Sequence, residues 1–93
     1  AASDVYKRQE LNNVIDEATI RVENLRVEIE ELKAAEAYQT AAEVSKSETT
    51  ISQREGTIAT ELNTIDNAQK EIDEYSARID LAAQEISDLR EEQ

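Results

Sequence analysis

The sequence predicts an all-α chain whose residues 10–93 form one long amphipathic helix with coiled-coil contacts to partner helices. Apolar residues recur at alternating steps of three and four early in the chain, and every seven residues later. Trp, Phe, Met, Cys, His and Pro are absent, and Gly56 is the only glycine. Compact domains need bulky core residues, and their loops usually contain Gly or Pro. This composition is instead typical of a long helix or coiled coil.

The first apolar row has the spacing of heptad positions a and d, which lie on one seam of a helix. Its a positions are Ile15, Val22 and Ile29, and its d positions are Leu11, Ala18, Leu25 and Leu32. β-Branched residues at a with Leu at d favour two strands when helices run parallel. The flanking charges do not select a partner, so strand number and orientation stay open.

A second row continues the pattern to the end of the chain. Its a positions are Val44, Ile51, Ile58, Ile65, Ile72, Ile79 and Ile86, and its apolar d positions are Ala68, Tyr75, Ala82 and Leu89. A straight helix would carry this row around its axis by about 20° per heptad, so the helix is expected to supercoil with a partner. The remaining d positions, Ser47, Arg54 and Glu61, are polar, which predicts a weakly packed segment over residues 45–61.

The two rows are out of register by one residue, because Ile15 and Val44 are 29 positions apart. The sequence therefore contains a one-residue heptad skip, which we place near residues 36–37. At 100° per residue, this spacing returns the side chain to within about 20° of its starting direction. One continuous helix can carry both rows, and we favour that interpretation.

The alternative is a two-helix αα-hairpin that turns within residues 45–57. Helix propensity is lowest there, and Thr50 with Gln53 and Ser52 with Glu55 match the capping-box pattern of a helix start. The isoleucine row crosses this segment without losing phase, which favours the continuous helix.

Residues 1–9, AASDVYKRQ, differ in composition from the remainder. The string resembles the translation of a sequencing-library transposon adapter read into an open reading frame. That resemblance implies a non-native leader, disordered or frayed, on a fragment assembled from metagenomic reads, and these residues are left out of the functional reasoning.

The charge restricts the class of partner. The chain is acidic, with a formal net charge of −12, so it repels nucleic acid and anionic lipid. No apolar run approaches the roughly 20 residues that span a bilayer, so no membrane insertion is expected. The lack of cysteine is compatible with any compartment, and localisation is therefore left open. The expected partner is another copy of the chain or another coiled-coil helix.

No motif predicts catalysis or cofactor binding. A carboxylate-bridged metal site in a helix bundle uses a Glu-x-x-His motif, and the chain has no His. The neighbours of Gly56 do not form a calcium loop. Acid or base catalysis needs a carboxylate in a pocket, whereas acidic residues such as Glu23, Glu30, Asp73 and Glu91 are expected on a solvated helix face. We therefore predict no enzyme activity, metal, cofactor or small-molecule substrate.

A fainter seven-residue row, formed by Ile20, Val27, Ala34 and Ala41, lies away from the first seam. It is either a second binding face or a set of scattered surface aliphatics, and we favour the second interpretation. Tyr38 and Tyr75 are expected to cover the edges of the seam.

The heptads that contain Ile58, Ile65, Ile72, Ile79 and Ile86 resemble the rods of long coiled-coil proteins, from cytoskeletal filaments to tethers and ATPase arms. The resemblance implies a structural or scaffolding rod segment that associates helices or spaces partners within a larger protein. The alternative function is a helical-hairpin docking module of a bacterial envelope or secretion adaptor, which would bind other helices through its tip.

Overall fold

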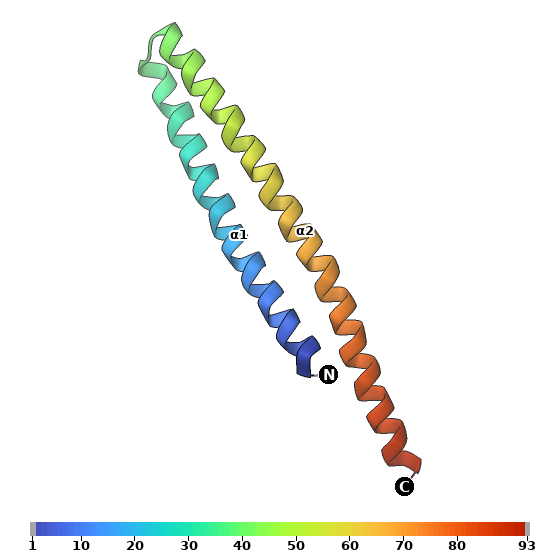
Figure 1. Ribbon diagram of the computed structural model, residues 1–93. Helices are drawn as coiled ribbons and strands as arrows, with labels where there is room; N and C mark the ends of the chain where they lie inside the picture. The colour runs from blue at the N-terminus through green and yellow to red at the C-terminus, as the bar shows by residue number, and fades with distance from the viewer. Residues whose placement is uncertain (1, 93) are drawn as a thin grey trace.

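The chain forms an elongated antiparallel helical hairpin, shown by a computed structural model that describes residues 2–92 (Figure 1). Helix α1 covers Ala2–Ala35, a short 3₁₀ turn η1 covers Glu36–Tyr38, and helix α2 covers Ala41–Glu92. The molecule measures 79 × 15 × 14 Å. The predicted all-α fold is confirmed, and no strand occurs in the described part of the chain.

The favoured prediction of one continuous helix is wrong. The chain reverses direction between Ala35 and Ala41, so the two-helix arrangement is the one that forms. The turn also differs from the alternative that placed it within residues 45–57, because that whole segment lies inside α2. The turn instead coincides with the one-residue register shift near residues 36–37.

The position of the turn follows from where the first apolar row ends and where a helix cap begins. After Leu32 the next two seam positions are Glu36 and Gln39, so a continued helix would place polar groups on its seam. Gln39 is extended, with φ −113° and ψ 156°, and its backbone N–H donates to the carbonyl of Glu36 at 3.3 Å. Thr40 then caps α2: its Oγ1 accepts from the backbone N–H of Glu43 at 3.3 Å and donates to the Glu43 carboxylate at 3.0 Å.

The Ser/Thr-rich segment stays helical because the helix satisfies its hydroxyl groups. Thr49, Thr50 and Thr57 each donate to the carbonyl four residues earlier, at 3.1 to 3.2 Å. Gly56 has a negative φ and lies in open space, with no atom near the position of a Cβ. Its cost relative to Ala is therefore the ordinary helix-propensity cost of about 1 kcal/mol, which the flanking isoleucines offset.

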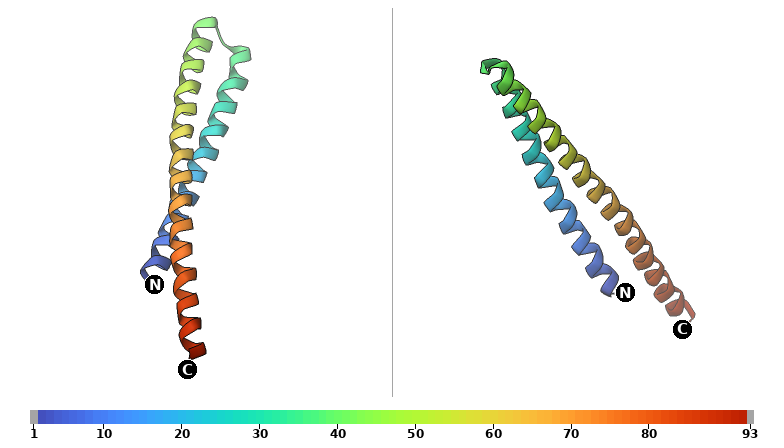
Figure 2. Two further views of the ribbon diagram at one scale, coloured as in Figure 1. Left: turned by 90° about the vertical axis from the view of Figure 1, so that its right-hand side faces the viewer. Right: turned by 45° about the horizontal axis from the view of Figure 1, so that its top comes forward.

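The core is one seam between the two helices rather than a globular interior. Its buried apolar residues all belong to the predicted rows: Ala18, Val22, Ile29, Ile51, Ala68 and Ile72. The helices change sides along their length, as expected of helices that wind around each other (Figure 2). The partner helix that both rows require is therefore supplied within the same chain.

The two ends of the hairpin differ. At the closed end the turn joins the helices, whereas at the open end α2 extends well beyond the N-terminal end of α1 (Figures 1 and 2). Residues 2–9 belong to α1, and residue 1 lies outside the described part. The proposed adapter origin of this leader stays a prediction. None of the described helices combines the length and the apolarity needed to cross a membrane.

Replacing Ile72 with Ala should lower the free energy of unfolding by at least about 2 kcal/mol, because the change leaves a cavity in the seam. The matched control is Leu81→Ala, which alters a side chain of the same size that is 65% exposed, and it should change stability by less than about 0.5 kcal/mol. Urea unfolding followed by far-ultraviolet circular dichroism measures both. Equal midpoints for the two variants would contradict the assignment of the seam.

Candidate functional site: the antiparallel helix interface

The predicted interface residues fall into three groups. Buried residues are Ala18, Val22, Ile29, Ile51, Ala68 and Ile72; half-buried residues are Leu11, Ile15, Leu25, Leu32, Val44, Ile58, Ile65, Tyr75, Ile79 and Ala82; exposed residues are Ile86 and Leu89. The half-buried residues are those expected of a two-helix seam, which has no third element to cover its edges. The first two groups thus form one continuous strip along both helices.

The last two seam residues extend beyond the paired region. Ile86 is 52% exposed and Leu89 is 61% exposed, although both continue the heptad row of α2. Both belong to the C-terminal part of α2, and the C-terminal end of this helix extends past the end of α1 (Figure 1). The row is therefore covered by α1 up to about Ala82 and uncovered beyond it.

Two polar d positions of α2 form ion pairs across the seam. The guanidinium of Arg21 donates to both carboxylate oxygens of Glu61, at 3.1 and 3.0 Å. One heptad closer to the turn, Arg54 approaches Glu28 at 3.2 Å. Arg54 and Glu61, two of the three residues that predicted a weakly packed segment, therefore contribute polar contacts between the helices in place of apolar ones.

These two ion pairs define an antiparallel register. Moving seven residues along α1, from Arg21 to Glu28, corresponds to moving seven residues back along α2, from Glu61 to Arg54. A slip of one residue would separate both pairs and rotate the apolar rows away from each other. Arg21, Glu28 and Arg54 are exposed and Glu61 is half-buried, so the contribution of these pairs at the seam edge lies more in selecting this register than in stability.

Near the open end, polar contacts continue the same register. Arg78 lies 3.8 Å from the carboxylate of Asp4, and its guanidinium is 5.0 Å from the centre of the Tyr75 ring. Arg8 donates to the hydroxyl of Ser76 at 3.4 Å. Tyr75 thus lies at the edge of the seam, as predicted.

The bidentate pair also affects the protonation of Arg21. The hydrogen bond to Glu61 raises the pKa of Arg21, supported by the charges of Glu61 and Glu17 and opposed by desolvation. A raised pKa in the folded state means that the stabilisation is present below the ordinary pKa of arginine and lost only in strongly alkaline solution. Arg21 therefore stays charged throughout the physiological pH range.

The turn exposes one aromatic residue and leaves several polar atoms without partners. Tyr38 is 93% exposed, so the expectation that it covers the seam is wrong. Ser47 is buried with no partner for its Oγ, and one side-chain oxygen each of Glu36 and Gln39 is also buried without one. Buried side-chain oxygens without a hydrogen-bond partner are therefore concentrated at this closed end of the hairpin.

The sequence contains one signal for this turn that was not among the predicted helix starts. Thr40-Ala41-Ala42-Glu43 has the spacing of a capping box, and Thr40 and Glu43 form the contacts of a helix cap. The pairs considered instead, Thr50 with Gln53 and Ser52 with Glu55, lie inside α2. The decisive difference is that Thr40 follows the end of an apolar row, whereas the other pairs lie within a row that continues past them.

The carboxylates considered for chemistry are dispersed. Glu23, Glu30, Asp73 and Glu91 are all exposed, on two different helices. Within residues 2–92, no three acidic side chains converge as metal ligands. A shallow groove near the turn is lined by Leu32, Gln39, Glu43, Lys46, Ser47 and Thr50. The candidate functional site is therefore the interface between the two helices, which the apolar rows of the sequence form.

Comparisons with known proteins add no assignment: no protein-family model, curated protein or solved structure matches the chain.

Reversing one charge of the bidentate pair tests the register. Arg21→Glu should lower the urea midpoint, because it places two carboxylates opposite each other, and the double variant Arg21→Glu with Glu61→Arg should recover most of the loss. Lys70→Glu is the control, since Lys70 pairs only within α2, with Asp66 at 3.1 Å. Failure of the double variant to recover stability would show that these residues do not face each other.

Proposed function

We propose that the chain is a non-catalytic structural arm, in which an antiparallel coiled-coil hairpin spaces or positions parts of a larger protein. The observation that supports this most directly is the continuous seam. Its buried residues, such as Val22, Ile29, Ile51 and Ile72, come from both helices of one chain. Such a hairpin can form without an external helix, so the arm is self-contained along most of its length.

The dimensions suit a spacer. At 1.5 Å per residue, the 34 residues of α1 separate the turn from the open end by about 50 Å. The other two dimensions are only 15 and 14 Å. A paired, narrow rod of this kind keeps its two ends at a fixed distance better than a single helix does, because the seam resists bending and local unfolding.

The charge and the chemistry of the surface are consistent with a role in protein contacts rather than catalysis. Exposed carboxylates are hydrated, whereas general acids and bases usually lie in pockets that exclude water. A net charge of −12 disfavours nucleic acid and anionic lipid as partners. The partners of this proposal are therefore proteins, with no cofactor or small-molecule substrate.

The open end is the place where we expect the arm to join other helices. Ile86 and Leu89 continue the seam past the end of α1 and expose apolar surface. Since the same heptad row is covered elsewhere by a helix, a helix is the element that fits it here. Such a junction would attach the arm at one end and leave the turn free at the other.

A distance measurement along the arm tests the spacer. Spin labels at Asn13→Cys and Ala37→Cys, both exposed in α1 and its turn, should give a narrow distance distribution centred near 36 Å. The lack of native cysteine makes the labelling specific. Ile29→Asn in the same labelled chain should broaden the distribution, because it places a polar group in the seam. A broad distribution in the unaltered chain would rule out a rigid spacer.

A second candidate function is docking through the turn, the hairpin-adaptor alternative. The exposure of Tyr38 favours it, since a nearly fully exposed aromatic side chain at the end of a rod is suited to contact a partner. The spacer function depends on the length of the hairpin, whereas the docking function depends on the side chain at its turn. Deleting one heptad from each helix, residues 22–28 and 54–60, changes the spacing but keeps the turn, whereas Tyr38→Ser changes the turn but keeps the spacing.

These variants decide between the two functions when each is placed in the protein that carries the arm. If the activity of that larger protein is lost only in the shortened variant, the result supports the spacer. If it is lost only in Tyr38→Ser, the result supports docking through the turn. The shortened hairpin should remain helical by circular dichroism, because the deletion preserves the heptad phase of both rows.

A further inference from the structure

The outermost surface of α1 carries a row of apolar side chains that nothing within residues 2–92 covers. Ile20 and Val27 are each 57% exposed, and Ala34 continues the row one heptad further. Ala41, the fourth member in the sequence, belongs to α2 and is not part of this surface. We call Ile20, Val27 and Ala34 the outer row of α1.

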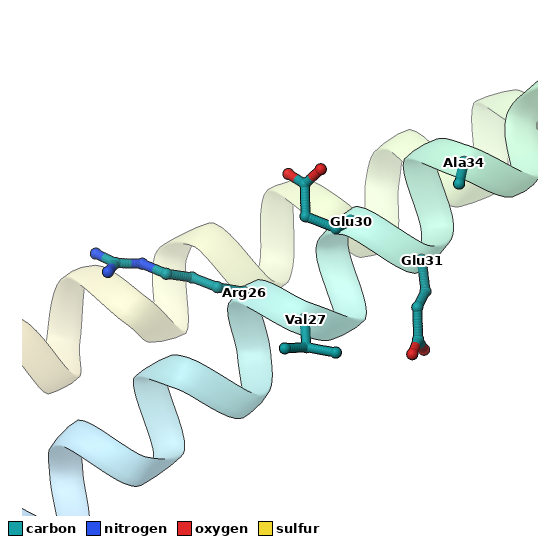
Figure 3. Close-up of a pocket in the computed structure, with 5 residues that line it drawn as sticks. All are labelled: Arg26, Val27, Glu30, Glu31 and Ala34. Carbon is teal, nitrogen blue, oxygen red and sulfur yellow. The ribbon is translucent and has the colours of Figure 1, made fainter.

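The geometry places the outer row opposite the seam. Figure 3 shows Val27 and Glu31 on the side of α1 that faces away from α2, and Ala34 follows Val27 by one heptad. Val27 and Ala34 form a shallow groove with Arg26, Glu30 and Glu31. The distance from Ile20 to Ala34 is about 21 Å along the helix, which is about three heptad-spaced contacts for a second helix.

The charges nearest to the outer row on the helix surface are acidic, although the basic residue Arg26 also lines the groove. Neighbours on a helix surface lie three or four residues apart. For Ile20 and Val27 these neighbours are Asp16, Glu17, Glu23, Asn24, Glu30 and Glu31, all of them exposed. Five of the six are carboxylates and none is basic, so the apolar row runs between two acidic borders.

The corresponding surface of α2 lacks this pattern. Its outermost heptad positions are Thr49, Gly56, Asn63, Lys70, Ala77, Gln84 and Glu91. A helix face that only meets water has no need of large aliphatic residues, and Ala77 is the one apolar side chain among these outermost positions of α2. The outer row of α1 departs from this pattern within the same molecule.

We propose that the outer row of α1 binds an amphipathic helix of another protein that presents an apolar seam flanked by Lys or Arg. The apolar side chains would cover Ile20, Val27 and Ala34, and the basic side chains would face the two acidic borders. A second copy of this chain fits poorly, because its own outer row has the same acidic borders and like charges repel across an interface. An anionic membrane is repelled for the same reason.

A synthetic helix provides the probe. We would use a fluorescent 21-residue peptide with Leu at heptad positions a and d and Lys at e and g, at concentrations where it is monomeric. Its counterpart has Glu at e and g. Fluorescence anisotropy should show saturable binding of the Lys peptide to the hairpin, weakening as salt rises, and no binding of the Glu peptide.

Matched variants of the hairpin locate the binding surface. Ile20→Gln with Val27→Gln should weaken binding of the Lys peptide by more than about tenfold. Leu62→Gln with Leu81→Gln removes two exposed aliphatic residues of α2 instead and should leave binding within about twofold. Both pairs are surface changes, and circular dichroism should show equal helicity.

A second pair of variants tests the acidic borders. Glu23→Gln with Glu30→Gln should weaken binding and reduce its salt dependence, whereas Asp73→Asn with Asp80→Asn, the same loss of charge on α2, should have a much smaller effect. Equal effects of both charge pairs would mean that the peptide is held by net charge alone, which overturns the proposal.

Three further outcomes would also overturn it. One is no binding of the Lys peptide, and another is equal binding of the Glu peptide. The third is self-association of the hairpin that is lost in Ile20→Gln with Val27→Gln, seen by sedimentation velocity, since the occupant would then be a second copy. None of these outcomes depends on whether the arm acts as a spacer.

Discussion

The burial of one apolar row against another is the interaction on which the whole hairpin depends. Isolated helices are marginal in water, and packing of an apolar face supplies most of their stability. Here α1 and α2 have mostly polar surfaces, and the buried residues are few and mostly small or β-branched, such as Ala18, Val22 and Ile72. Without the seam, neither the turn nor the ion pairs would hold the helices together.

An apolar seam alone does not define which residues face each other, because heptad rows can pair in several registers. The polar positions remove that ambiguity. Arg21 with Glu61 and Glu28 with Arg54 are satisfied together only in the observed antiparallel register. The middle of α2 thus exchanges apolar packing for specificity, a use of polar groups well attested in coiled coils.

The sequence predicted helical structure and an apolar seam, but favoured one continuous helix over the two helices that form. The repeat of Ile and Leu depends on helical geometry, so residues from Leu11 to Ala82 could be assigned to the interface before the structure was known. A heptad row requires a partner but does not say whether that partner belongs to the same chain. A supercoil around another molecule and a supercoil within a hairpin therefore leave the same pattern.

The turn escaped prediction because it uses neither Gly nor Pro. Its signals were the register shift between Ile15 and Val44, the polar seam positions Glu36 and Gln39, and the cap formed by Thr40. Each is also compatible with a continuous helix, and only their coincidence at one place indicates a reversal. Low helix propensity was a poor guide, since the Ser/Thr-rich segment became part of α2.

The outer row of α1 follows from the same reasoning about faces. A hairpin needs one apolar face per helix, and α2 has one up to its uncovered end. Helix α1 has two, because Ile20 and Val27 lie opposite the seam that Val22 and Ile29 form. Folding of the hairpin buries the seam face of α1 against α2. The outer row, bordered by carboxylates, stays available for a contact outside the chain.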